Sequence, residues 1–386
     1  MVTVSRSSAT SVFSAAVLVA ASLFLAGCDR TPDTIKIGVA QPLTGGIAAL
    51  GKDLVNGVQL AVNELNKEGF KLNGKLVTLE MVVVDDKSNA AEGVKVAQQL
   101  VDAGVVAVIG HLNSGVSIPA APIYAAKGIA QLAISSNPKF TELGHPTTLR
   151  LVANDDLQAR AVGAFAGSQI QGTKFAVVDD GTPYGKGLAD AAADKIKVKK
   201  TVALRQGFDD KTTDFTALAD KLKADGIEVV VSTLNDFQVV ALIANLKKIG
   251  YAKQITILGT DMLKTTEMIK HTGEVSAFYA TSIVLEANEF AAGKAFLDAY
   301  QAAFKVPPAY GGHYTYDATY VLASAIRRAK SADPAKITEV LRKMDGYAPV
   351  TGSMKWTEKG EQRYGVVSVY KANGTSWESI MRSDSW

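Results

Sequence analysis

The sequence predicts an α/β fold in which mostly parallel sheets are covered by helices on both faces. Two observations favour this class: short β-rich runs alternate regularly with helix-length segments, and those segments keep apolar residues on one face. The length is a third observation. A chain of 386 residues is longer than a single hydrophobic core usually holds, so we expect two lobes.

The alternation can be followed element by element along the chain. The predicted strands cover residues 34–40, 77–84, 105–110, 174–180, 227–233 and 254–259. Two of the intervening segments show the spacing of an amphipathic helix, with Leu54, Val58, Ala61 and Leu65 on one face of the first, and Val239, Leu242, Ile243 and Leu246 on one face of the second. At the C-terminus two further β-rich runs are joined by Asn373-Gly374, a dipeptide that favours a tight hairpin.

The N-terminus has the pattern of an export signal. Arg6 provides a positive charge, residues 11–26 are apolar, and no acidic residue precedes Asp29. Leu25-Ala26-Gly27-Cys28 resembles a bacterial lipobox, so we expect residues 1–27 to be removed and Cys28 to carry the lipid. The alternative is ordinary cleavage, which leaves a free thiol. Asp29 resembles an inner-membrane retention signal, so we expect a periplasmic protein anchored in the inner membrane.

The composition of the chain after residue 27 argues against an internal disulfide, a nucleic-acid partner and a membrane span. Cys28 is the only cysteine, so the mature chain forms no internal disulfide. Without Arg6 the basic residues number one fewer than the 41 of the full chain, against 38 acidic ones, which leaves no electrostatic footprint for nucleic acid. Beyond residue 28 no apolar stretch is long enough to cross a bilayer. We therefore expect membrane contact through the lipid alone.

None of the common catalytic motifs is present. Gly181 and Gly185 are too close for a phosphate-binding loop, and no serine has the surroundings of a hydrolase nucleophile. Four histidines occur without the spacing of metal ligands, and pairs of aspartates fall mainly where carboxylates cap strand ends and helix starts. We therefore expect no enzymatic activity, no cofactor and no metal.

The segment HLNSG, residues 111–115, is the most informative polar stretch. It follows a buried strand and precedes a predicted helix. In open parallel sheets ligands bind beyond the carboxyl ends of the strands, where helix N-termini present unpaired N–H groups. Ser114 is expected to be both the N-cap of that helix and a hydroxyl beside its positive end. A ligand carboxylate suits this position.

Several segments together resemble the branched-chain amino acid binding proteins of ABC transporters, the leucine/isoleucine/valine type. They are GHLNSG, IPAAPIY, DDGTPYGKGLA, TDFTALADKLKADGIEVVV and the hairpin with Trp356 and Gly360. The resemblance covers residues 33–386 and implies a type I periplasmic binding fold, whose two lobes close on a small ligand. With crossovers near residues 153, 282 and 357, lobe 1 takes 33–153 and 283–357, and lobe 2 takes 154–282 and 358–386.

The resemblance also implies a ligand site and partners. The implied ligand-binding residues are Leu50, Leu112, Ser114, Ser135, Asn137, Tyr184, Asn235 and Asp261. Ser114 and N–H groups near Asn137 would hold an α-carboxylate, whereas the Ser135 carbonyl, the Asn137 side chain and Asp261 would hold an α-ammonium. Tyr184 would cover the ligand. A monomer would pass its amino acid to the permease and ATPase subunits of the transporter.

Departures from the family pattern concern specificity. Leu112 and Leu50 would line the side-chain pocket, but Leu50 and Asn235 stand where classical members have aromatic residues, and Asn137 replaces a threonine. A small disulfide loop beside the serine is missing. The ligand is then smaller, more polar or one of several. Two alternatives stay open. The first is a binding protein of the same fold that is a receptor for short amides or urea, or a ligand sensor. The second is a secreted hydrolase built on a doubly wound sheet.

Overall fold

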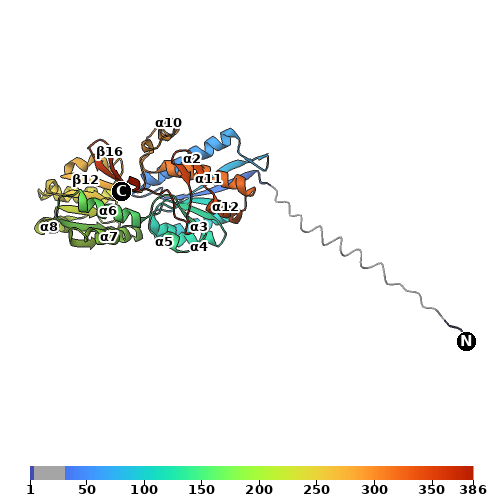
Figure 1. Cartoon of the computed structure of the whole chain (residues 1–386), viewed down its shortest axis with the longest axis horizontal. Coiled ribbons are helices and arrows are strands. Elements are labelled where there is room, and N and C mark those ends of the chain that lie inside the picture. The colour runs from blue at the N-terminus through green and yellow to red at the C-terminus, as the bar shows by residue number, and fades with distance from the viewer. Residues whose placement is uncertain (4–30, 386) are drawn as a thin grey trace.

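The computed structural model describes residues 1–3 and 31–385. Cys28, Asp29 and nearly all of the expected signal peptide lie outside this range, so their predicted roles stay predictions. Among the described residues, no helix combines the length and the apolar character that a membrane span requires. The two main sheets lie side by side along the long axis of the molecule (Figure 1).

The first sheet is fully parallel and has the strand order β4-β1-β5-β6-β7. Its strands are β1 Thr34–Gln41, β4 Thr78–Asp85, β5 Ala107–Gly110, β6 Ala130–Ala133 and β7 Thr148–Arg150. Strands β5 and β6 are buried on both faces, so they do not alternate between apolar and polar residues. Apart from Gln131, they consist of apolar or small residues. Two short hairpins lie apart from this sheet, β2 Lys71–Leu72 with β3 Lys75–Leu76, and β13 Gly346–Ala348 with β14 Gly352–Met354.

The second sheet has the order β16-β15-β12-β11-β10-β8-β9. Its parallel part contains β8 Lys174–Asp179, β9 Thr201–Gly207, β10 Val229–Ser232, β11 Thr256–Gly259 and β12 Ala277–Ser282. The C-terminal hairpin, β15 Ser368–Ala372 and β16 Trp377–Arg382, adds two antiparallel strands beside β12. The sequence's final strands therefore complete a sheet begun some 200 residues earlier.

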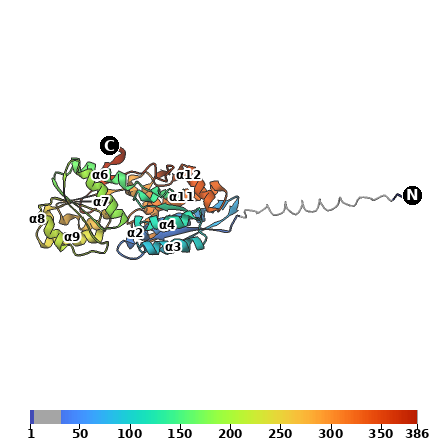
Figure 2. The same ribbon diagram turned by 90° about the horizontal axis from the view of Figure 1, so that it is seen from below.

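Helices cover both faces of the sheets, as the sequence predicts. They are α2 Ala48–Glu68, α3 Ala90–Asp102, α4 Ser114–Ala125, α5 Lys139–Glu142, α6 Asp155–Ser168, α7 Pro183–Ile196, α8 Thr216–Ala224, α9 Asp236–Lys248, α10 Gly293–Phe304, α11 Gly312–Ala329 and α12 Pro334–Lys343. In both views α3, α4, α11 and α12 lie with the first sheet, and α6, α7 and α8 lie with the second (Figures 1 and 2).

The largest hydrophobic core joins the first sheet to helices from a distant part of the chain. Ile37 and Ile109 of the sheet share this core with Leu54 and Val58 of α2 and with Val321 of α11. Separate apolar clusters lie on the two faces of the second sheet. The chain thus passes between the two sheets after β7, after β12 and before β15. The lobe boundaries at 153, 282 and 357 stay a prediction.

The six predicted strands and the C-terminal hairpin are confirmed, with strand ends shifted by up to two residues. The hairpin turn is longer than expected, because Asn373–Ser376 separate the paired Ala372 and Trp377. Gly374 has a φ of 89°, and the Asn373 side chain accepts bonds from the N–H groups of Thr375 and Ser376. The expected N-cap of α4 is wrong by one residue, since Asn113 is the cap and Ser114 begins the helix.

Candidate functional site

A cavity of about 520 Å³ lies where the carboxyl ends of the parallel strands of the two sheets meet. Its walls come from loops after β4, β5 and β6 of the first sheet and after β8, β9, β10 and β11 of the second. The loop before α2 touches the opposite wall, because a Cβ on Gly46 would lie 2.9 Å from the ring of Phe237. The cavity therefore stands at the strand ends where α/β sheets bind ligands.

Ser114 forms the donor-rich end of this cavity. It is 2% exposed, it lines the cavity, and its Oγ accepts a bond from the Asn137 N–H at 3.2 Å. Because that bond uses an oxygen lone pair, the hydroxyl proton is left to donate. Gly115 and Val116, the next residues of α4, also line the cavity. The positive dipole end of this helix start favours an anion here.

Asp261 forms the acceptor end, directly after β11. Its Oδ1 accepts bonds from Gln158 Nε2 and Tyr184 Oη, both at 2.8 Å, and its Oδ2 accepts one from Tyr310 Oη at 3.0 Å. Burial raises the pKa of Asp261, although these hydrogen bonds counteract it. Burial and the charge of Asp261 also raise the pKa of Tyr184 well above 10, so the phenol stays a neutral donor.

Asp261 is a carboxylate without a cationic partner among the described residues. It is 3% exposed, and three neutral donors fix the directions of its oxygens. A buried charge with neutral partners only is costly unless a cation joins it. An ammonium group entering the cavity is the natural completion of this arrangement.

Ser135 and Asn137 lie beside the cavity without lining it. The Ser135 carbonyl accepts a bond from Arg150 Nη1, and the Asn137 carbonyl accepts one from Arg150 Nη2 at 3.0 Å. The Asn137 side chain donates to the Pro183 carbonyl at 2.7 Å, which links the loop after β6 to the start of α7. Both residues are therefore engaged in holding the walls together. Ser136, between them, is the residue that faces the cavity.

Of the other expected residues, three line the cavity and one does not. Leu112, Tyr184 and Asn235 line the cavity together with Ser114 and Asp261. Leu50 does not: it is 5% exposed and packs in the core of the first sheet. Burial alone does not separate these cases, since Leu50 and Leu112 are equally buried.

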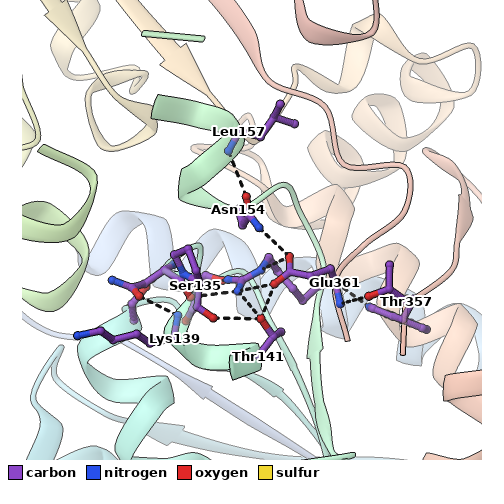
Figure 3. Close-up of polar contacts among 12 residues, drawn as sticks. Ser135, Lys139, Thr141, Asn154, Leu157, Thr357 and Glu361 are labelled. Carbon is purple, nitrogen blue, oxygen red and sulfur yellow. Dashed lines mark hydrogen bonds and ion pairs between the residues drawn. The ribbon is translucent and has the colours of Figure 1, made fainter. Parts of the chain in front are cut away.

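An Arg150–Glu361 ion pair supports the wall that contains Ser135 and Asn137. Arg150 is fully buried and meets the carboxylate through Nε at 3.0 Å and Nη2 at 3.1 Å. Figure 3 shows Glu361 between the Ser135–Thr141 segment and Asn154, to which it is also hydrogen-bonded. Burial raises the pKa of Glu361, but the Arg150 charge together with the hydrogen bonds from Arg150, Thr141 and Asn154 outweighs burial, so the net shift is downward. The pair therefore remains ionised.

Three residues that hold other site residues in place were not expected from the sequence. Gln158 and Tyr310 hold Asp261, and Arg150 holds the loop after β6. They come from a helix interior, a loop and a strand end, and none belongs to a motif. Arg150 carries the one available signal, because an arginine between the apolar Leu149 and Leu151 needs an anionic partner if that segment is buried.

His111, which precedes Leu112 of the cavity wall, is held by two buried side chains. His111 is hydrogen-bonded to Asp86 at 2.7 Å and to the Tyr124 hydroxyl at 3.1 Å, which is a structural role. The part of the chain that the structure describes contains no group of three or more potential metal ligands.

The comparisons with known proteins agree with this geometry. The family model described as "Periplasmic binding protein" matches residues 34–376. A curated relative from Brucella abortus (strain 2308), named Leu/Ile/Val-binding protein homolog 1, is 30% identical over 339 residues, which are 87% of this chain and 90% of the relative. A Pseudomonas aeruginosa protein named for binding leucine, isoleucine, valine, threonine and alanine is 30% identical over 347 residues, covering 88% and 90%.

Among solved structures, a leucine binding protein from Thermotoga maritima is similar with a TM-score of 0.81 and 26% identity, covering 91% of this chain and 100% of that one. The expected type I periplasmic binding fold, with parallel sheets flanked by helices, is thereby confirmed. On the match of the family model to most of its length, this chain belongs to the periplasmic binding protein family.

Proposed function

We propose that this chain captures an aliphatic, branched-chain or related amino acid in the cavity between its two sheets and delivers it to the permease of an ABC importer. The observation that carries the proposal is the presence of Ser114 and Asp261 in the walls of one cavity. The first offers a hydroxyl and a helix start, and the second offers a buried carboxylate without a cationic partner among the described residues. The names of the relatives support an amino acid as the ligand.

The chemistry of an amino acid matches these two ends. Its carboxylate and ammonium are on one carbon, so a site needs a donor group and an acceptor carboxylate a few ångströms apart in a dry cavity. Hydrogen bonds to charged groups contribute roughly 1.5 to 3 kcal/mol each, whereas a helix terminus contributes about 0.3 to 2 kcal/mol. Two or three such bonds plus apolar burial give about −8 kcal/mol after association costs, a micromolar dissociation constant.

Ligand binding is proposed to select a closed arrangement of the two lobes. Ser114 follows a strand of the first sheet and Asp261 follows one of the second, so the ligand's two charges contact both. A ligand shifts a conformational equilibrium only through such differential contacts. The permease would recognise the closed shape.

The location and partners follow from the N-terminal sequence and the family. We propose that residues 1–27 direct export, that Cys28 is lipidated, and that the protein works in the periplasm as a monomer anchored in the inner membrane. The permease and ATPase subunits of the importer are its proposed partners. The proposed role is binding and release of the ligand, without catalysis.

A thermal-shift screen of the common amino acids, short amides and urea tests the proposal. A ligand at a hundred times its dissociation constant adds about 2.7 kcal/mol to the stability of the folded state. Stabilisation by at least one amino acid is expected. A response to amides or urea alone, unchanged in Asp261→Asn, would favour the alternative receptor, and product formation would favour a hydrolase.

A further inference from the structure

A second buried carboxylate, Asp180, lies in the wall of the same cavity. Asp180 directly follows β8 and is 4% exposed. Its Oδ1 accepts bonds from the Thr182 N–H at 3.0 Å and the Thr182 hydroxyl at 2.7 Å. Its Oδ2 accepts only a longer bond, at 3.3 Å, from the side chain of Asn235.

No lysine or arginine among the described residues forms an ion pair with Asp180, whereas its neighbour Asp179 pairs with Arg205. Burial raises the pKa of Asp180 to about 6, against the effect of the Thr182 bonds, and the charges of Asp179 and Asp210 raise it further. Asp180 thus lies in a cavity wall with neutral partners only, a costly arrangement that a donor from a ligand would relieve.

The topology sets the distance between the two cavity carboxylates. Asp180 follows β8 and Asp261 follows β11, and β10 lies between these strands in the sheet. At about 4.8 Å per strand, the two positions are roughly 10 Å apart. With a hydrogen bond of about 3 Å at each end, a ligand that reaches both needs two donors separated by roughly 4 Å or somewhat more. The α-ammonium and a donor at the end of a short side chain meet this requirement.

The two lysines that line the cavity are less suited than Asp180 to recognise a ligand. Lys87 and Lys211 line it as well, but both are exposed, and Lys87 lies 3.8 Å from Glu92. Exposed charges at a rim contribute little to affinity because water screens them. Apolar side chains, including Leu112 and Phe237, provide contact for the methylene groups of a side chain that leads to Asp180.

We propose that Asp180, with Asn235 beside it, recognises an N–H donor at the end of the ligand's side chain, so that the cavity prefers amino acids with a short amine or amide side chain over aliphatic ones of the same size. This inference rests on the proposed function. It narrows the range of proposed ligands to one chemical class of amino acid, and it gives the polar Asn235 in the cavity wall a role.

Isothermal titration calorimetry with pairs of ligands of equal size tests the inference. Ornithine ends in an ammonium group where norleucine has a methyl group. Glutamine ends in an amide, which can donate hydrogen bonds, where glutamate has a carboxylate, which only accepts them. We expect ornithine or glutamine to bind about ten- to hundredfold more tightly than its partner. In Asp180→Asn, which keeps an oxygen for Thr182, the preference for ornithine should fall at least tenfold.

The matched control is Asp210→Asn, which removes a less buried carboxylate at the same cavity and should change the ornithine preference less than threefold. Equal or tighter binding of norleucine and leucine by the unmodified protein overturns the inference while the proposed function stands. Binding of no amino acid at all overturns both. The comparison in the unmodified protein decides the question even if Asp180→Asn does not fold.

Discussion

Replacing Asp155 with asparagine should make the protein more stable at neutral and alkaline pH. Asp155 begins α6 behind the cavity, it is 2% exposed, and neither carboxylate oxygen has a hydrogen bond of normal geometry among the described residues. Burial raises the pKa of Asp155 to about 8, the Ser136 hydroxyl and Arg150 lower it, and Asp261 raises it further. The folded protein therefore keeps a proton that the unfolded chain has lost.

The sign and size of the effect follow from proton linkage. An unfolded aspartate titrates near pH 3.9, so between about pH 4 and pH 8 the folded state binds more protons than the unfolded state. The contribution of Asp155 to stability is then greatest below pH 4 and falls by up to about 1.4 kcal/mol per pH unit as pH rises, a loss of about 5 kcal/mol by pH 9. Asparagine does not titrate, so the variant lacks this loss.

The assay is urea unfolding of the unmodified protein and Asp155→Asn at pH 5, 7 and 9. The stability gained by the variant should grow by about 3 kcal/mol between pH 5 and pH 7. Taking the difference between the two proteins removes the titration of unrelated groups. Asp156→Asn, an exposed neighbour in the same helix turn, is the control and should show no such growth. A gain that is the same at all three pH values would refute the reasoning.

Three further substitutions test the packing and the site walls. Gly57→Ala should destabilise by about 3 kcal/mol in urea unfolding, because its Cβ would lie 1.9 Å from the Gly312 carbonyl oxygen where α2 meets α11. Glu361→Gln should cost about 3 kcal/mol, since the fully buried Arg150 loses its ion-pair partner. Asn137→Ala should accelerate ligand release about fivefold in stopped-flow measurements, because the bond to the start of α7 is lost.

Two controls separate these effects from general sensitivity to substitution. Gly273 has no atom within 4 Å of an added Cβ, so Gly273→Ala should be nearly neutral. Glu358 is exposed, and Glu358→Gln should leave stability within about 0.5 kcal/mol. Equal losses in a control and its partner substitution would contradict the packing or ion-pair explanation.

Much of the fold could be predicted because its elements are locally consistent. The run Val105–Ile109 is apolar and is followed by Gly110, so neighbouring residues indicate both that the strand is buried and where it ends. Strand β7 escaped prediction because Thr148–Arg150 is too short to show a period, and it is held by pairing with β6 and by a bond from the Arg150 N–H to the Gly360 carbonyl. Such contacts join residues far apart in sequence, and no local pattern records them.

Most of the site residues that could be predicted from the sequence lie just after strand ends. Ser114 and Asp261 follow β-rich runs directly, and both line the cavity. Leu50 lies in a helix, and its direction depends on how α2 packs, which placed it in the core instead. Tyr310 reaches Asp261 from a loop almost 50 residues away, through a fold-level contact that spacing cannot reveal.

The central claim is that Asp261 binds the ammonium of an amino acid whose carboxylate lies at Ser114. Its most direct test is calorimetric titration of an amino acid that binds and of the carboxylic acid with the same carbon skeleton and no amino group, with the unmodified protein and with Asp261→Asn. The unmodified protein should prefer the amino acid by about tenfold or more, and the variant should largely lose this preference. An equal preference in both proteins would contradict the claim.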